Sequence, residues 1–122
     1  MENIIRKIES IAADETINAR DKMDFAVAQL YLGQESCFAL IEQLTPLFLK
    51  IIEQGVQEGY FSCDYSAEYA ELFLVSLLYL NWTPEKRKEK AKAVASAMEM
   101  ILETELGAFD CVVKKFELLA AS

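Results

Sequence analysis

The sequence of 122 residues contains no histidine and has four glycines, two prolines and one tryptophan. Histidine is the usual general base of enzymes and the commonest protein ligand of metals, so its absence excludes histidine-dependent triads and the common zinc sites. The Glu-x-x-His pairs from which di-iron bundles are built are excluded for the same reason. No Gly-rich loop has the spacing that holds a phosphate group. We therefore expect neither an enzyme nor a bound metal or cofactor.

The cysteines Cys37, Cys63 and Cys111 are odd in number and widely spaced. This usage fits reduced thiols in a core better than a disulfide framework. The N-terminus lacks the pattern of a secretory signal. The most apolar run, residues 72–80, is far shorter than the roughly 20 residues that cross a bilayer. We predict a cytoplasmic protein that does not enter a membrane.

Acidic residues outnumber basic ones by 20 to 12, which gives a formal net charge of −8. Such a surface repels phosphate backbones, so we expect no nucleic acid to bind to this chain alone. Glutamates alternate with basic residues in the one basic stretch, and no aromatic residue does. We therefore favour an exposed helix face over an anion-binding patch there. The stretch contains Lys86, Arg87, Lys88, Lys90 and Lys92.

A content of 53% hydrophobic residues with little glycine or proline favours helix nearly throughout. No alternating apolar pattern predicts a strand. We predict an all-α bundle of about six helices that forms a single domain over residues 1–122. The expected helices run from Asn3 to Ala13, from Glu15 or Thr16 to Leu32, from Thr45 (after a short lead-in from Glu35 or Ser36 to Gln43) to Gly59, from Asp64 or Ser66 to Leu80, from Pro84 to Gly107, and from Asp110 onward.

The firmest of these boundaries rest on two Thr-Pro pairs and two glycines. In Thr45-Pro46 the hydroxyl can cap a helix and proline suits the first helical position, and Thr83-Pro84 repeats the signal. Gly59 and Gly107 can each adopt the left-handed conformation that ends a helix. We expect Tyr60-Phe61 to pack back over the last turn before Gly59.

The centre of the chain reads Leu44-Thr45-Pro46 and then Ile52-Glu53-Gln54-Gly55-Val56-Gln57-Glu58-Gly59-Tyr60-Phe61. This run resembles the C-terminal, effector-binding half of TetR-family transcriptional regulators, and the helix order around it is similar too. The resemblance implies a domain that senses an effector and dimerises. Members of that family also carry an N-terminal helix-turn-helix domain, which nothing in this sequence matches. We therefore expect operator binding to need such a domain.

The resemblance also implies a largely apolar cavity between the first helices and the central pair, lined by aromatic residues and a few polar groups. We expect a small apolar or aromatic effector there. The candidate ligand-binding residues lie on stripes that should face inward, and they are Phe25, Gln29, Phe38, Phe48, Tyr69 and Phe73.

Surplus apolar surface indicates a homodimer. The helix at Ala67 to Leu80 is apolar on nearly all sides, so a small bundle cannot bury every face of it. In the following helix, apolar residues at spacings of four, three and four form a seam, which could equally serve a contact inside the chain. The resemblance implies that this helix pair makes the twofold contact. The expected interface residues are Phe73, Leu77, Ala91, Val94, Ala95, Met98 and Leu102.

A second class of function remains open, which is a helical protein-interaction or assembly module with no small-molecule ligand. A closed cavity inside the bundle would favour the effector-binding domain.

Overall fold

The computed structural model describes residues 2–32, 38–82, 85–104 and 107–114. These residues form a helical bundle, and none of them lies in a strand, so the all-α prediction is confirmed. A last helical segment begins at Asp110 and reaches Lys114, where the described residues end. The five helices before it are α1 (Glu2–Ala13), α2 (Ala19–Leu32), α3 (Phe38–Gln57), α4 (Ser66–Trp82) and α5 (Arg87–Ile101).

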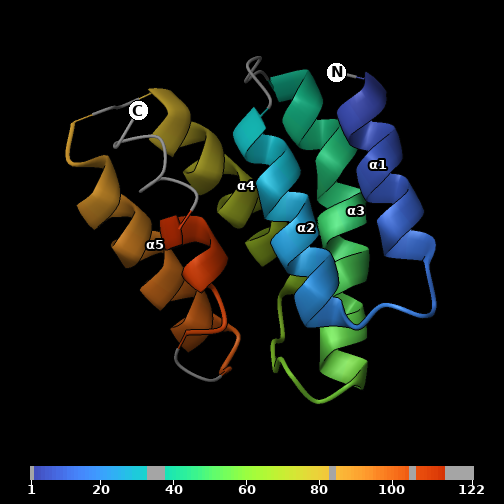
Figure 1. Cartoon of the computed structure of the whole chain (residues 1–122). Helices are drawn as coiled ribbons and strands as arrows, with labels where there is room; N and C mark the ends of the chain where they lie inside the picture. Colours follow the sequence, from blue (N-terminus) through green and yellow to red (C-terminus); the bar gives the residue numbers. More distant parts are fainter. Residues whose placement is uncertain (1, 33–37, 83–84, 105–106, 115–122) are drawn as a thin grey trace.

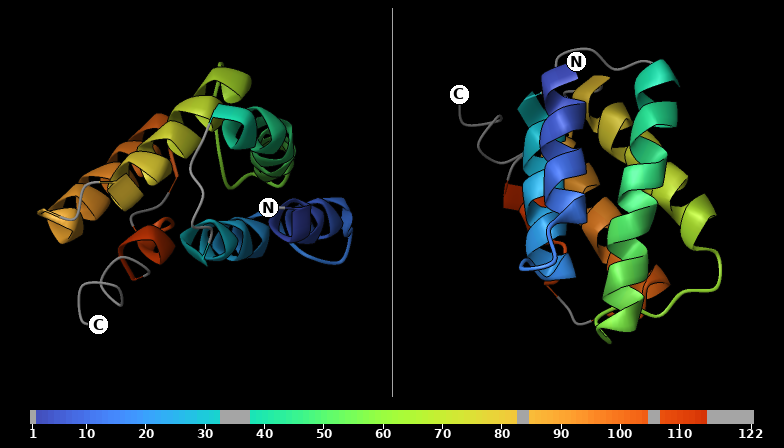
Figure 2. Two further views of the ribbon diagram at one scale, coloured as in Figure 1. Left: turned by 90° about the horizontal axis from the view of Figure 1, so that it is seen from above. Right: turned by 90° about the vertical axis from the view of Figure 1, so that its right-hand side faces the viewer.

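Helix α3 occupies the middle of the arrangement. It contacts α1, α2 and α4, whereas α5 packs against α4. The hairpin of α1 and α2 lies on one side of the bundle and the pair α4 and α5 on the other, as Figures 1 and 2 show. The last segment, 110–114, lies between α5 and α2 (Figure 2). It thus covers the side of the bundle that faces away from α3.

The core draws on each of these elements. Ile8, Phe48, Phe73 and Phe109 have no exposed surface, and they come from α1, α3, α4 and the turn that leads into the last segment. Burial of one such side chain contributes roughly 1.5–3 kcal/mol relative to exposure. The apolar faces that the sequence patterns predict therefore pack together in one hydrophobic core.

The structure confirms the predicted helix end at Gly59, whose φ is 85°. The Tyr60 N–H donates to the Gly55 carbonyl over 2.8 Å, and the Gly59 N–H donates to the Val56 carbonyl over 3.2 Å. These two bonds form a Schellman motif, which satisfies carbonyls that the helix end leaves without partners. The first helix also lies within one residue of its predicted start.

The predicted helix start at Thr45-Pro46 is wrong, because α3 runs without interruption from Phe38 to Gln57 with Pro46 inside it. The Thr45 hydroxyl donates back to the Ile41 carbonyl over 2.7 Å instead of capping a new helix. Pro46 is exposed, so the carbonyl that loses its helical partner, that of Glu42, lies on the solvent side. Burial of the opposite face of α3 outweighs the local preference for a break.

The predicted start of the second helix, at Glu15 or Thr16, is also wrong, since α2 begins at Ala19. Asp14 accepts hydrogen bonds from the Thr16 N–H and hydroxyl, over 2.8 and 2.6 Å, and so forms a turn at these residues. Asn18 then accepts the Asp21 N–H over 2.8 Å and caps the helix.

The predicted bounds of the long helix, Pro84 to Gly107, need a correction at the end. α5 ends at Ile101, and Glu103 adopts a left-handed φ of 50°. Gly107 does adopt a left-handed φ of 90°, but it does so in the turn that leads into the last segment. The expected start at Thr83-Pro84 lies outside the described residues.

Candidate functional site

Two of the predicted ligand-binding residues meet inside the bundle. The rings of Phe48 in α3 and Phe73 in α4 lie 6.1 Å apart between centroids, and both are fully buried. Phe109 stands edge-on to Phe73 at 5.3 Å, and Phe61 stacks on Phe109 at 5.9 Å. We call Phe48, Phe61, Phe73 and Phe109 the aromatic cluster. Sequence reasoning named the first and third of these as ligand contacts and missed the other two.

The remaining predicted ligand-binding residues lie elsewhere. Phe25 and Gln29 are half-buried on α2. Tyr69 is half-buried at the start of α4, where its ring meets that of Tyr65 at 6.3 Å and lines a depression of about 160 Å³. The side chain of Phe38 lies outside the described residues. The structure thus brings Phe48 and Phe73 together and places Tyr69 apart from them.

A buried carboxylate fixes the position of Phe109. Glu99, on α5, is 7% exposed, and its Oε2 accepts the Gly107 N–H over 3.1 Å and the Phe109 N–H over 2.9 Å. The expected cap, Asp110, is the first residue of the last helical segment. The carboxylate of Glu99 therefore satisfies two N–H groups of the turn that precedes this segment.

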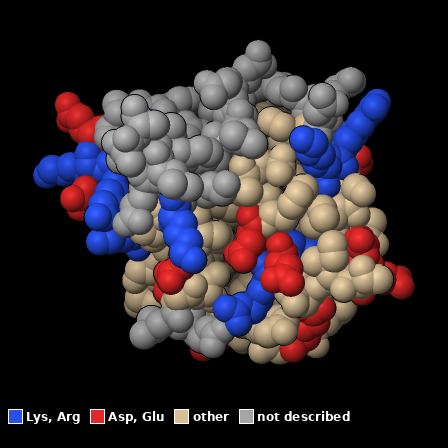
Figure 3. All heavy atoms as spheres, in the orientation of Figure 1, with Lys and Arg blue, Asp and Glu red and all other residues tan. Residues whose placement is uncertain are grey.

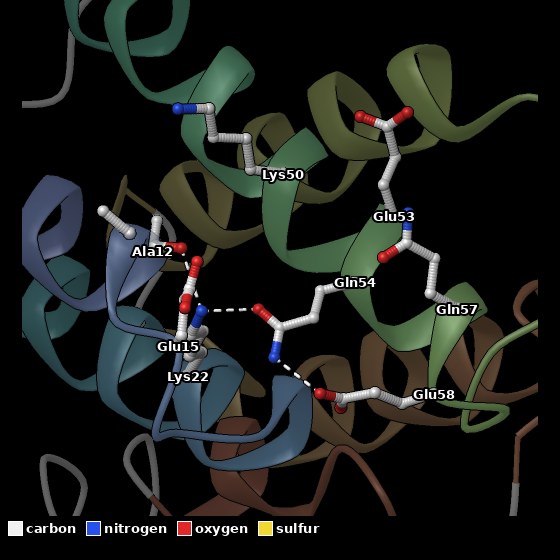
Figure 4. Close-up of a pocket in the computed structure, with 9 residues that line it drawn as sticks. Ala12, Glu15, Lys22, Lys50, Glu53, Gln54, Gln57 and Glu58 are labelled. Atoms are coloured by element: carbon white, nitrogen blue, oxygen red, sulfur yellow. Dashed lines mark hydrogen bonds between the residues drawn. The ribbon is translucent and has the colours of Figure 1, made fainter.

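A second site is polar and lies where α1, α2 and α3 meet (Figure 4). It is an open groove of about 510 Å³. Lys22 is 2% exposed, and its Nζ donates to the Ala12 carbonyl over 2.9 Å and to Gln54 Oε1. In the same view Lys50 and Glu53 point away from this contact.

Gln54 and Glu58 extend this contact into a network. Gln54 Nε2 donates to the Ile17 carbonyl over 2.9 Å and to Glu58 Oε2 over 2.7 Å. Glu58 Oε1 accepts the Ala19 N–H over 2.9 Å, and this bond, followed by the one from Gln54, lowers the pKa of Glu58. We call Lys22, Gln54 and Glu58 the polar network. It ties the turn between α1 and α2 to the end of α3.

The polar network was not predicted from the sequence, although the sequence contains a pattern that indicates it. Lys22 interrupts an apolar stripe of Ala19, Met23 and Ala26, which are all buried. A lysine on such a stripe must find acceptors for its ammonium group. The Ala12 carbonyl and Gln54 Oε1 are the acceptors that the structure provides, and Glu58, one turn after Gln54, accepts in turn from the Gln54 amide.

Six of the seven predicted dimer-interface residues lie in the core of their own chain. Phe73, Ala91 and Leu102 have no exposed surface, Leu77, Ala95 and Met98 have at most 4%, and Val94 is half-buried. The seam with spacings of four, three and four thus faces the interior of the same subunit. The twofold contact itself remains a prediction.

The outer faces of α4 and α5 carry a different set of apolar side chains. Leu72, Val75 and Tyr79 of α4 are 56%, 41% and 49% exposed, and Met100 of α5 is 75% exposed. Spacings of three and four place the three α4 residues on one side of that helix. We call these four residues the outer apolar face.

The basic stretch at the start of α5 packs partly against α4. Arg87 Nε donates to the Leu80 carbonyl over 2.8 Å, and Lys90 Nζ lies 5.2 Å from the Tyr79 ring centroid. Figure 3 shows acidic and basic side chains interleaved over α5. Lys86, Lys88 and Lys92 are exposed. This arrangement matches a solvated helix face.

The thiols of Cys63 and Cys111 are free and half-buried. Burial, followed by the nearby charge of Asp24, raises the pKa of Cys111, so this thiol stays protonated at neutral pH. Cys37 lies outside the described residues. Within the described ranges, no three potential metal ligands lie close enough to hold a metal ion. None of the described helices has the length and apolar character needed to span a membrane.

The family model of tetracyclin repressor-like C-terminal domains matches residues 9–104. This range includes the central run with Gly55, Gly59 and Phe61, which the structure shows to form a helix end and a packing contact. No curated protein and no solved structure matches the chain. Since the family model covers well over half of the sequence, the chain belongs to the tetracyclin repressor-like C-terminal domain family.

Proposed function

We propose that this chain is the effector-sensing and dimerisation domain of a transcriptional regulator, and that residues 1–122 act as one unit. The observation that carries the proposal is the fully buried contact of Phe48 and Phe73 between α3 and α4, within a domain of this family. Interiors lined by aromatic side chains suit small apolar or aromatic ligands. Phe25, Gln29, Phe38 and Tyr69 stay as further candidate contacts on the surrounding helices.

Helix α4 offers a route from the effector to the partner subunit. Its inner face carries Phe73, and its outer face carries Leu72 and Val75. A ligand that moves Phe73 therefore acts on the helix that carries the outer apolar face. Such a shift can link two sites only if the ligand binds the two positions of α4 with different affinity.

For the homodimer we propose the outer faces of α4 and α5 as the contact, because the inner faces are occupied by the chain's own core. Leu72, Val75, Tyr79 and Met100 give each subunit a self-complementary apolar patch that a twofold axis can pair with itself. Exposed Ala93 and Ala97 on α5 allow the backbones to approach closely. Burial of a patch of standard size, at about 25 cal/mol per Å², is the stabilising term that must exceed the entropy of association.

A pair of matched substitutions tests the interface. Val75 in α4 and Val56 in α3 are 41% and 39% exposed, so Val75→Glu and Val56→Glu place the same charge at equal exposure on different faces. We expect sedimentation velocity to show a dimer for the unmodified chain and for Val56→Glu, and a monomer for Val75→Glu. A monomeric unmodified chain at tens of micromolar, or a dimeric Val75→Glu variant, would contradict this interface.

Effector binding is tested by thermal unfolding with a library of small aromatic molecules. A ligand at 100 times its Kd stabilises the folded chain by about 2.7 kcal/mol, which raises the Tm by several degrees. We expect aromatic compounds to give such shifts, and Phe48→Ala to change which compounds do so. If no compound raises the Tm of the unmodified chain, the interaction-module alternative is favoured.

Domains of this family regulate rather than catalyse, and we propose no reaction for this chain. We further propose that the chain alone does not bind nucleic acid, because its net charge of −8 repels a phosphate backbone. A cytoplasmic location is consistent with its free thiols.

A further inference from the structure

Phe109 fills the centre of the region that we propose for the effector. Its ring stands edge-on to Phe73 at 5.3 Å and stacks on Phe61 at 5.9 Å, and it has no exposed surface. Phe73 in turn meets Phe48. A foreign ring that packs against both Phe61 and Phe73 would therefore take the position that Phe109 now occupies.

The segment that carries Phe109 is held by contacts that can be replaced. Residues 107–114, which we call the terminal segment, follow α5 through a turn at Gly107 with a φ of 90°. Two of its backbone N–H groups, at Gly107 and Phe109, donate to the one oxygen Glu99 Oε2. On its other side an open depression of about 450 Å³ separates it in part from α2, where Arg20 and Asp24 line the wall.

We propose that the terminal segment is an exchangeable plug, and that the effector is a small aromatic molecule carrying an ammonium group. The inference rests on the proposed effector function and specifies its ligand. The aromatic ring of the ligand replaces the Phe109 ring between Phe61 and Phe73. The ammonium group replaces the two backbone N–H donors at the Glu99 carboxylate.

The ammonium requirement follows from the burial of Glu99. Glu99 is 7% exposed, and its carboxylate loses the Gly107 and Phe109 N–H donors when the terminal segment leaves. A buried charge without donors or an opposite charge is strongly unfavourable. A neutral aromatic ring with no donor group would not replace those two N–H donors, and an aromatic acid would add a second negative charge. An ammonium group on the ligand supplies both hydrogen-bond donors and an opposite charge to the Glu99 carboxylate.

Competition with the plug reduces the apparent affinity. Because the ligand binds only the open form, its apparent Kd equals the intrinsic Kd divided by the fraction of open molecules. Removal of the Phe109 ring raises that fraction. We expect Phe109→Ala to bind an aromatic ammonium ion at least tenfold more tightly than the unmodified chain. An apolar cavity of roughly 150 Å³ is already enough to bind benzene in another protein.

The decisive measurement is amide hydrogen exchange on the unmodified chain with phenethylamine as the probe. We expect saturating phenethylamine to raise the Tm and to accelerate exchange at the amides of Gly107 and Phe109, while amides in the middle of α3 become slower. 3-Phenylpropionate, which has the ring and the opposite charge, should do neither. Glu99→Gln should reduce the preference for phenethylamine over 2-phenylethanol.

Phe109→Ala removes a fully buried ring from the core, so a second variant opens the plug without changing the aromatic residues around it. Gly107→Ala strains a residue at φ 90° and brings its Cβ to 3.3 Å from Asp110 Oδ2, which loosens the terminal segment. We expect it too to bind phenethylamine more tightly than the unmodified chain.

The outcomes separate this inference from the proposed function. If aromatic molecules bind while the amides of Gly107 and Phe109 stay protected, the effector function stands and the plug is wrong. If phenethylamine binds only when Phe109 is replaced, the plug does not exchange in the natural chain and the inference is wrong. If 3-phenylpropionate binds as well as phenethylamine, the ligand class is wrong. Absence of any Tm shift across the aromatic library refutes the effector function itself.

Discussion

The ring of Phe61 lies directly over the α-carbon of Gly55, so that a Cβ built on Gly55 would fall 2.1 Å from Phe61 Cδ2. Phe61 is 5% exposed and stacks on Phe109, so it cannot move aside cheaply. Glycine at position 55 is therefore a packing requirement. Gly59, four residues later, is required by the backbone conformation instead. Its φ is 85°, and a Cβ built on it would meet no atom within 4 Å.

The first prediction concerns these two glycines. Gly55→Ala gains about 1 kcal/mol of helix propensity but overpacks the core at a cost of about 3 kcal/mol, so we expect a net loss of about 2 kcal/mol in the free energy of unfolding. Gly59→Ala should lose about 1–2 kcal/mol through its left-handed backbone. Urea denaturation in a Phe61→Leu background separates the causes, because the smaller side chain should relieve the Gly55 variant alone. Equal costs in both backgrounds would contradict the packing explanation.

The second prediction concerns Lys22. Lys22→Met keeps the buried stem but removes the donor to the Ala12 carbonyl and Gln54 Oε1. We expect the free energy of unfolding to fall by about 1–3 kcal/mol, because those acceptors lose their partner. Lys50→Met, at an exposed position in the same groove, should change it by less than about 0.5 kcal/mol. Equal effects of the two substitutions would argue against a structural role for the polar network.

The third prediction is a pH dependence. Hydrogen bonds from Ala19 and Gln54 lower the pKa of Glu58 below its ordinary value of 4.5. A carboxylate with a lowered folded-state pKa stabilises the fold at neutral pH, and this contribution is lost as the pH falls below about 4.5. Glu58→Gln should therefore be less stable than the unmodified chain at pH 7, and the two should converge in acid. Stability measured by denaturation from pH 7 to pH 3, with Glu53→Gln as the control, checks this.

Asp14 should add to the same acid slope. Its side-chain and backbone bonds with Thr16 lower its pKa from 3.8.

A stability difference between Glu58→Gln and the unmodified chain that stays constant down to pH 3 would contradict the third prediction.

The fourth prediction concerns Pro46, which lies inside α3 and is exposed. Pro46→Ala restores an N–H that can donate to the Glu42 carbonyl, and it removes a residue that costs roughly 3 kcal/mol in a helix interior. The more flexible unfolded chain offsets about 0.4–1 kcal/mol of this gain. We expect a net stabilisation of about 2 kcal/mol by urea denaturation. Lys50→Ala, one turn further on, is the control, and a loss of stability in Pro46→Ala would show that the helix depends on proline.

The helical fold could be predicted because composition and periodicity agree along most of the chain. The helix end at Gly59 was predicted correctly, because a glycine that follows an amphipathic run is typical of a left-handed helix end. Thr45-Pro46 was misread, because a proline at the start of a helix and one on the solvent side of a longer helix look alike locally. Only the burial of the residues on either side decides between the two.

The site was harder to predict for a related reason. Spacings of four, three and four describe a helical seam, but they do not tell whether the facing helix belongs to the same chain. The structure places Ala91, Ala95 and Met98 in their own core, and the seam is internal. Phe109 and Glu99 lie far in sequence from the central run, and their contact depends on how the chain turns back after α5. No local pattern encodes that return.

The last turn of α3 is held from two directions at once. Gln54 bonds to the α1–α2 turn, while its neighbour Gly55 supports Phe61 and the opposite half of the bundle. Successive residues of an α-helix point about 100° apart, so rotation of α3 about its axis would break one of these contacts. Relative motion of the two halves must therefore bend α3 instead of turning it. Bending costs least at Pro46, where the helix lacks a backbone hydrogen bond. The last turn of α3 therefore stays fixed while the part of the helix before Pro46 bends relative to it.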